Sequence, residues 1–162
     1  MKLAFLLPIS LFACTLLAGC AGYSPGKNII GADRAAVTAL MGKPAQDVQL
    51  TEGSRLVYPR GPYGRHTYFV DLNSQGLVTR WEQVLAEENF KRIQPNQTKA
   101  AVEALIGPSF IKTQLARNRG EVWAYRFETP FCIWFEIEFS AQDTVRSAGY
   151  GFPPECLRDD HL

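Results

Sequence analysis

The chain contains an internal repeat, and this repeat constrains its fold more than any other feature. Residues 31–44 read GADRAAVTALMGKP, and residues 96–108 read NQTKAAVEALIGP. When Asp33 is aligned with Thr98, the two segments share their apolar positions, a polar residue before these positions and a glycine after them. Self-similar segments indicate repeated copies of one supersecondary unit. We therefore expect two tandem units that fold alike.

Each repeat predicts a short amphipathic helix with its own start and stop signals. Asp33 and Thr98 precede the helices as N-caps, whose side-chain oxygens accept hydrogen bonds from free backbone N–H groups. Apolar residues follow at i, i+1, i+4 and i+5, which places them on one helical face. Gly42 and Gly107 end the helices in a left-handed conformation, and a proline lies just beyond each of them.

Alternating side chains after each helix predict antiparallel strands. In the second repeat, apolar residues at the odd positions from Phe131 to Phe139 alternate with cysteine, tryptophan and glutamate. Tyr68, Val70 and Leu72 of the first repeat align with positions 135, 137 and 139. Further strands are expected at residues 55–58 and 77–81 of the first repeat, and at residues 122–127 and 144–150 of the second.

These elements predict an α+β fold of two tandem units, each a short helix (or helix pair) followed by a three-stranded antiparallel meander. The first unit spans residues 29–81, the second spans residues 82–152, and residues 153–162 form a C-terminal tail. Residues 82–93 join the units and are expected to contain a helix that opens the second one. A sheet with one apolar face needs a cover, and one short helix covers little. We therefore expect the two units to lean on each other and to share a core.

The first twenty residues predict export from the cytoplasm. Lys2 precedes an apolar run from Leu3 to Leu17, and small residues then lead into Cys20. A basic start, a short apolar stretch and small residues before a cleavage point are typical of a secretory signal. The run is short for a membrane span, which needs about 20 residues. We expect residues 1–19 to be a signal peptide, and residues 20–28 to be a lipidated N-terminus and flexible tether.

The ending LAGC at residues 17–20 resembles the bacterial lipobox, where a peptidase cuts before an acylated cysteine. This resemblance implies lipidation of Cys20, and mature lipoproteins of this kind carry several acyl chains, which hold a membrane stably. Alanine and glycine follow the cysteine in place of the aspartate that retains such proteins in the inner membrane. The resemblance thus implies an outer-membrane protein facing the periplasm. An ordinary secretory peptide and an uncleaved anchor are the alternatives.

Two cysteines, Cys132 and Cys156, remain once Cys14 leaves with the signal and Cys20 is acylated. In an exported protein an even pair is most simply a disulfide, and closing this loop adds about 3 kcal/mol of stability. A zinc site is the alternative. Two cysteines this far apart in the sequence, with no histidine pair nearby, have poor zinc spacing. We therefore expect a disulfide and no metal.

The charge balance argues against nucleic acid as a partner. Of the charged side chains, only Lys2 leaves with residues 1–19, so basic and acidic side chains are equal in number in the remaining chain. It has no basic stripe and no base-stacking motif in a basic setting. The apolar fraction of 46% is enough for a packed core, which excludes global disorder.

No motif of the chain predicts an active site. His66 and Asp71 could be drawn with a serine as a triad, but no serine lies in a Gly-x-Ser-x-Gly context. Glu136 and Glu138 share a strand face, as a glycosidase pair could, but the polar outer face of a sheet explains them better. Cys132 lacks an obvious base to activate it. We expect a non-enzymatic protein with no cofactor and no small-molecule substrate.

The segment from Arg55 to His66 is the candidate surface for partner binding. Residues 59–66 are long for a hairpin tip and have no equivalent in the second repeat. Loops on a rigid scaffold carry function more often than regular elements do. Tyr63, flanked by Arg60 and Arg65, has the residue types enriched in binding hot spots, for a protein partner or for acidic lipid headgroups. A solvated turn is the alternative.

Trp134 is the other candidate for partner binding, because it lies on the polar side of its predicted strand. Either the tail around Cys156 covers it, or it is an exposed binding aromatic. Residues 152–156 are expected to form an extended segment stapled back across that face.

The repeat resembles the SmpA/OmlA (BamE-like) outer-membrane lipoprotein family. Residues 93–108, IQPNQTKAAVEALIGP, carry the match, and residues 30–44 match more loosely. The resemblance implies a scaffold or accessory factor in outer-membrane β-barrel assembly and envelope integrity, with barrel-assembly proteins as partners. Members of that family carry one such unit, whereas this chain carries two. Tandem units also resemble the β-lactamase-inhibitor-protein fold, which implies the alternative of a periplasmic protein-binding or inhibitor module.

Overall fold

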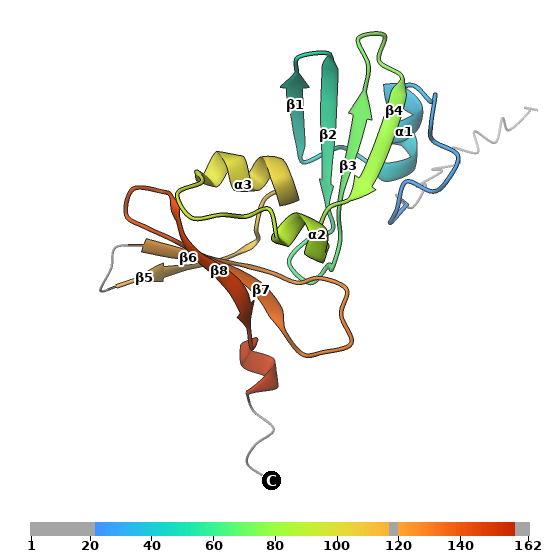
Figure 1. Ribbon diagram of the computed structural model, residues 1–162. Helices are drawn as coiled ribbons and strands as arrows, with labels where there is room; N and C mark the ends of the chain where they lie inside the picture. The colour runs from blue at the N-terminus through green and yellow to red at the C-terminus, as the bar shows by residue number, and fades with distance from the viewer. Residues whose placement is uncertain (1–21, 117–119, 158–162) are drawn as a thin grey trace, which may run out of the picture.

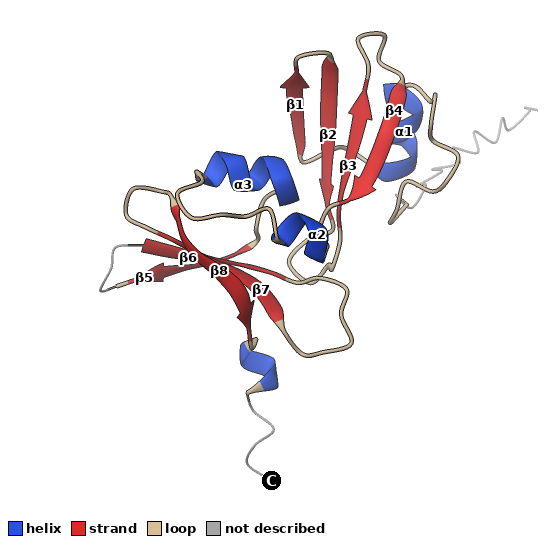
Figure 2. Ribbon diagram, in the orientation of Figure 1, coloured by secondary structure: helices blue, strands red, loops and turns tan. Residues whose placement is uncertain are grey.

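The computed structural model describes residues 22–116 and 120–157, and these residues form two similar β-sheet units (Figure 1). The first unit consists of α1 (Arg34–Met41), β1 (Gln46–Leu50), β2 (Gly53–Pro59), β3 (Thr67–Leu72) and β4 (Val78–Gln83). The second consists of α2 (Glu87–Phe90), α3 (Lys99–Ile106), β5 (Ile111–Leu115), β6 (Gly120–Tyr125), β7 (Trp134–Phe139) and β8 (Val145–Gly151). A short 3-10 helix, Pro154–Cys156, follows. Both sheets are antiparallel with their strands in chain order (Figure 2).

The predicted α+β class with three-stranded meanders is wrong. The described residues are mostly β, with four strands in each sheet and a few short helices. The additional strands, β1 and β5, lie at the sheet edges and pair only with β2 and β6. The three middle residues of each are exposed. An edge strand exposed on both faces has no apolar alternation, which is why the sequence pattern does not indicate it.

The strand expected from residue 131 begins later, at Trp134. Residues 126–133 form a long loop between β6 and β7, in which Cys132 is joined to Cys156. The apolar alternation continues into this loop because Ile133 packs against the core of the second unit, while Phe131 is exposed. At Ile133 the apolar alternation therefore indicates a side chain packed against the core, and not a residue paired in a strand.

The repeated helices form as predicted. The Asp33 side chain accepts a hydrogen bond from the Ala36 backbone at 2.8 Å, and Thr98 accepts one from Ala101 at 3.2 Å. Each N-cap residue also bridges the start of the last strand of its own unit. The glycines after the two helices have φ values of 82° and 78°, which favour glycine over other residues. The two helix starts and ends are therefore built alike.

The repeat also fixes the hairpins that lead into the central strands. A Cβ atom on Gly53 would lie 1.9 Å from the carbonyl oxygen of Leu72. The same atom on Gly120 would lie 2.2 Å from the carbonyl oxygen of Phe139. The alignment that matches Leu72 to Phe139 also matches the two glycines to each other. Only glycine fits where the first residue of the second strand passes so close to a neighbouring backbone.

Each unit has its own apolar core on one face of its sheet. The first core joins α1 to β2, β3 and β4, and the second joins α2 and α3 to β6, β7 and β8. A smaller cluster of Val57, Phe69 and Val84 lies apart from both cores. The end of α3 meets this part of the first sheet, because Gly107 approaches Thr67 and Phe69. The units thus lean on each other, but the expected shared core is wrong, because each unit keeps a core of its own.

The outer faces of the two sheets differ at equivalent positions. Val57 pairs with Phe69 in the first sheet, and Ala124 pairs with Glu136 at the same register in the second. Phe69 is buried, whereas Glu136 is only partly buried. A surface depression on the second sheet is lined by Glu136, Glu138 and Ser147. The second sheet therefore presents a polar outer face where the first presents an apolar one.

The predicted signal peptide of residues 1–19 and the lipidation site Cys20 lie outside the described residues. No helix within residues 22–116 and 120–157 is long and apolar enough to cross a membrane.

Candidate functional site

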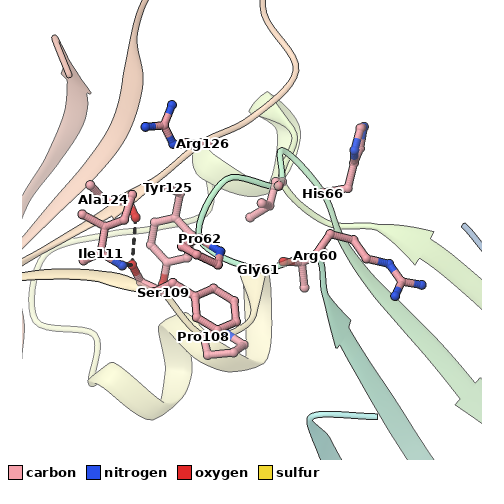
Figure 3. A pocket seen from close by; sticks show the side chains of 14 residues that line it. Arg60, Gly61, Pro62, His66, Pro108, Ser109, Ile111, Ala124, Tyr125 and Arg126 are labelled. Carbon is pink, nitrogen blue, oxygen red and sulfur yellow. Dashed lines mark hydrogen bonds between the residues drawn. The ribbon is translucent and has the colours of Figure 1, made fainter. Parts of the chain in front are cut away.

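The long loop between β2 and β3 lies at the junction of the two units. Gly61 and Pro62 of this loop line a pocket together with Ser109, Ala124 and Tyr125 of the second unit. Figure 3 shows Pro62 beside Tyr125, while the side chains of Arg60 and His66 point away from this pocket. The backbone of the predicted binding loop is therefore partly used to join the units.

The polar groups at this pocket are bonded internally. The Ser109 hydroxyl donates to the carbonyl of Ala124 at 2.8 Å and accepts from the backbone N–H of Ile111 at 3.1 Å. The Tyr125 hydroxyl donates to the carbonyl of Gly107 at 3.2 Å. Burial raises the pKa of Tyr125 well above its usual value, so this hydroxyl stays protonated. These groups fix backbone positions at the junction.

Arg60, predicted to bind a partner, is packed within the first unit. Its guanidinium lies 5.6–5.7 Å from the ring centroids of Tyr23, Tyr58 and Tyr68. It also donates a hydrogen bond to the carbonyl of Gly22 at 3.0 Å. Burial lowers the pKa of Arg60, although the surrounding tyrosines oppose this shift. Arg60 therefore holds the start of the described chain against the first sheet.

The structure does not assemble the triad that could be drawn from His66 and Asp71. The His66 Nδ1 atom lies 2.7 Å from the Tyr23 hydroxyl, and its Nε2 atom lies 3.7 Å from Glu128. Both carboxylate oxygens of Asp71 instead accept hydrogen bonds from Arg55, at 2.6 and 2.9 Å. The Asp71 carboxylate, which would be the acid of that triad, is therefore already paired with Arg55.

The other two catalytic candidates are also engaged elsewhere. Cys132 is bonded to Cys156, with the two Cα atoms 6.1 Å apart, as the cysteine count predicts. Glu138 forms an ion pair with Arg146 of the neighbouring strand. Glu136 lies on the same outer face of β7, two positions from Glu138. Among the residues that the structure describes, no group of three or more His, Cys, Asp and Glu side chains is placed to hold a metal ion.

The remaining three predicted binding residues gather near Arg126. The Arg126 guanidinium lies 6.0 Å from the Tyr63 ring centroid and 5.0 Å from the Trp134 ring centroid. Its Nη2 atom donates to Glu155 at 2.5 Å. Arg65 lines the same depression as Arg126, Trp134 and Glu155. We call Tyr63, Arg65, Arg126, Trp134 and Glu155 the junction surface, because both units contribute to it.

Trp134 is covered on one side and open on the other, so both alternatives for it hold in part. Pro153 and Glu155 of the tail line the depression beside it, and the residue is half-buried. Its Nε1–H group is buried and has no hydrogen-bond partner among the described residues. The Nε atom of Arg126 is in the same state. The tail thus pairs with Arg126 through Glu155 but leaves Nε of Arg126 and Nε1 of Trp134 without a partner among the described residues.

Sequence reasoning missed two residues of this surface, Arg126 and Glu155. In the sequence, Arg126 alternates with Tyr125 and Phe127 and therefore belongs to the polar side of the predicted strand, as Trp134 does. Pairing of these two strands in an antiparallel hairpin could have placed the two side chains on one face. The sequence therefore contains evidence that places Arg126 beside Trp134. This evidence can be used only when the path of the loop between the two strands is known.

The strongest charge cluster of the second unit lies elsewhere and connects α3 to the sheet. Lys99 Nζ lies 2.7 Å from both Glu121 and Asp143, and Trp123 Nε1 donates to Glu121 at 2.6 Å. Burial alone would raise the pKa of Glu121, but the hydrogen bonds from Lys99 and Trp123 lower it. Burial alone would lower the pKa of Lys99, but its bonds to Asp143 and Glu121 raise it.

Comparison with known proteins gives only distant structural neighbours. No family model matches the chain, and no curated protein matches its sequence. A DUF4309 family protein (YjgB) from Bacillus subtilis has 11% identity and a TM-score of 0.32, over 80% of this chain and 86% of that one. An extracellular protein containing an SCP domain from Bacillus anthracis has 15% identity and a TM-score of 0.31, over 81% of this chain and 46% of that one. No function is carried over from either protein.

Proposed function

We propose that this protein is a non-enzymatic, lipid-anchored protein-binding module of the bacterial outer membrane, facing the periplasm. The observation that carries the binding role is the junction surface, where Tyr63, Arg126 and Trp134 meet. Tyrosine, tryptophan and arginine are the residue types that dominate the energetics of protein interfaces. The proposal needs no cofactor, metal or small-molecule substrate.

The junction surface has the rigidity that favours tight binding. Its residues come from the β2–β3 loop, the β6–β7 loop, the start of β7 and the tail, and the Cys132–Cys156 disulfide joins the β6–β7 loop to the tail. Tyr63 is 85% exposed, so its ring offers apolar area to a partner. A surface that is ordered before binding loses less conformational entropy when a partner docks.

The membrane anchor is proposed from the lipobox-like ending at Cys20. Gly22, two residues later, is held by hydrogen bonds from Arg60 and to the carbonyl of Leu40. Two residues of extended chain reach about 7 Å at most. The lipid would therefore hold the first unit close to the membrane surface, and the second unit would extend away from it.

Two narrower roles fit the proposal. The resemblance to the SmpA/OmlA family points to a scaffold role in outer-membrane β-barrel assembly, with barrel-assembly proteins as partners. The second role is that of a periplasmic binding or inhibitor module. The four-stranded units depart from the three-stranded meander expected of a BamE-like unit, so the fold does not add support to the first role.

Site-specific crosslinking tests the proposal in the acylated protein in native membranes. A photo-crosslinking residue replaces Tyr63, and the same residue at Lys112, on the exposed edge strand β5, serves as the control. Capture of an envelope protein from position 63 alone is expected. Barrel-assembly proteins in that product support the scaffold role, and another envelope protein supports the binding module. Capture of lipid only, or equal products from both positions, contradicts the proposal.

A further inference from the structure

A groove beside the β6–β7 loop is distinct from the depression at the junction surface, although residues of this loop line both. It runs between that loop and α2, and its volume is about 550 Å³. Figure 1 shows α2 near this loop, which is drawn in orange. We define the groove by the residues that line it, which are Gln83, Leu85, Ala86, Glu87, Glu88, Phe127, Glu128, Thr129, Pro130, Phe131, Ile133 and Tyr150.

The floor of the groove is aromatic and fixed by packing. The Phe127 and Tyr150 rings lie 5.8 Å apart, and Phe127 packs edge-on against Phe90 at 5.2 Å. Tyr150 also contacts Phe135 of the core, with the ring centroids 5.7 Å apart. Half of Tyr150 and most of Phe131 are exposed to solvent. The rings of Phe127 and Tyr150 are thus held by neighbouring rings, and Tyr150 and Phe131 leave aromatic area exposed to water.

The rim of the groove is acidic. Glu87 and Glu88 of α2 stand on one side, and Glu128 of the β6–β7 loop stands on the other. Among the described residues, Glu88 has no ion-pair partner, while Glu87 pairs with Lys91 and Glu128 pairs with Arg65, each at 3.6 Å between exposed side chains. None of the described residues that line the groove is basic. Long exposed pairs contribute little energy, so the rim stays available to a more closely placed cation.

The rim and the floor act together on Tyr150. Burial and the nearby Glu87 carboxylate raise the pKa of the Tyr150 hydroxyl. The hydroxyl therefore remains a neutral hydrogen-bond donor at physiological pH. The exposed rings of Tyr150 and Phe131 can also attract a cation through their π faces.

We propose that this groove binds a segment of a partner protein that carries basic side chains around an apolar anchor residue. The inference rests on the proposed function, in that the ligand is a protein. The anchor residue covers the exposed rings of the floor, which removes apolar area from water. The basic side chains reach the three carboxylates of the rim and the ring faces beside them. An acidic segment would be repelled by the same carboxylates.

A peptide-binding measurement tests this inference with the full acylated protein in detergent micelles. The probe is a fluorescent ten-residue peptide in which lysines surround one central phenylalanine, and binding is followed by anisotropy. A second peptide has glutamate in place of every lysine. We expect the basic peptide to bind about tenfold or more tightly than the acidic one, with affinity that falls as salt rises. Equal affinity of the two peptides overturns the inference.

Variants of groove residues test whether the basic peptide binds in the groove. Phe131→Ala is expected to weaken the basic peptide about tenfold, and the double variant Glu87→Gln/Glu88→Gln to weaken it severalfold. All three side chains are exposed, so the protein is expected to fold. Phe152→Ala and Glu52→Gln, at exposed positions outside the groove, are the matched controls. Equal effects of the groove and control variants overturn the inference. Tyr63 does not line this groove, so the crosslinking experiment tests the proposed function separately. If position 63 captures an envelope protein but the basic peptide does not bind, the groove inference is wrong and the proposed function still holds.

Discussion

Gly107 at the end of α3 approaches Thr67 of β3 so closely that a Cβ atom at residue 107 would lie 2.8 Å from the Thr67 methyl carbon. This contact joins the end of the second unit's helix to the outer face of the first unit's sheet. The same glycine has a φ of 78°, and its carbonyl accepts the Tyr125 hydroxyl. One residue therefore ends a helix, anchors a buried tyrosine and sets the distance between the units.

The variant Gly107→Ala is expected to be less stable than the matched variant Gly31→Ala. Both glycines have a positive φ, but a Cβ atom on Gly31 meets no other atom within 4 Å. Both substitutions strain the backbone, because alanine disfavours a positive φ. Only Gly107→Ala adds a steric clash, which is expected to lower the free energy of unfolding by about 1–3 kcal/mol more. Urea unfolding of the two variants measures this difference. Equal losses would show that the contact between the units relaxes without cost.

The two tryptophans of the second unit should respond in opposite ways to replacement by phenylalanine. Trp123 donates its Nε1–H to Glu121, whereas the same group of Trp134 is buried without a partner in the described part of the chain. Trp123→Phe is expected to cost about 1–3 kcal/mol, because the Glu121 carboxylate loses one of its charge-assisted hydrogen bonds. Trp134→Phe removes an unsatisfied donor and is expected to be neutral or slightly stabilising. Thermal unfolding compares them, and a similar loss in both contradicts the account.

Stability should depend on pH through Glu121 and Lys99. The folded-state pKa of Glu121 is lowered, so its stabilisation is present above the unfolded pKa of about 4.3 and is lost as pH falls through the lower folded value. The folded-state pKa of Lys99 is raised, so its stabilisation is present below about pH 10.4 and is lost as pH rises through the higher folded value.

The variant Glu121→Gln isolates the acid limb of this dependence. We expect its free energy of unfolding to fall less than that of the wild type between pH 6 and pH 3, measured by urea titration at each pH. Glu52→Gln, at an exposed turn position, is the control and should follow the wild type. Parallel curves for all three proteins would exclude Glu121 as the source of the acid sensitivity.

Loss of the Cys132–Cys156 disulfide should affect the second unit selectively. Replacing both cysteines by serine removes the closure of a 24-residue separation, which is expected to cost about 3 kcal/mol. Hydrogen exchange should increase first in the β6–β7 loop and the tail that it joins, and not in β2 or β3. Uniform loss of protection across both sheets would instead mean that the units unfold as one.

The sequence predicts the helices well because their signals are local. Asp33 and Thr98 cap their helices within three residues, and the glycines at 42 and 107 end them. Edge strands carry no such signal. Val48, in the centre of β1, is 41% exposed and lies between polar neighbours, so nothing in its surroundings indicates pairing with β2.

The proposed binding residues could be predicted as residue types but not as a surface. Tyr63, Arg65 and Trp134 were recognisable from composition and position, yet Arg60 of the same loop turns inward to Tyr58 and Tyr68. The inward turn depends on a contact with Gly22, which lies far earlier in the sequence. Long-range contacts of this kind are not encoded in local periodicity.

The exchange of Phe69 for Glu136 at equivalent positions of the two sheets also limits how far the duplication can extend. In repeat arrays the terminal copy needs a polar outer face, because no further copy covers it. Glu136 provides such a cap, since another helix docked as α3 docks on the first sheet would bury its carboxylate. The substitution Glu136→Phe would give the second sheet an apolar outer face. Further copies of the chain would then be able to bind to this face, and the protein would self-associate.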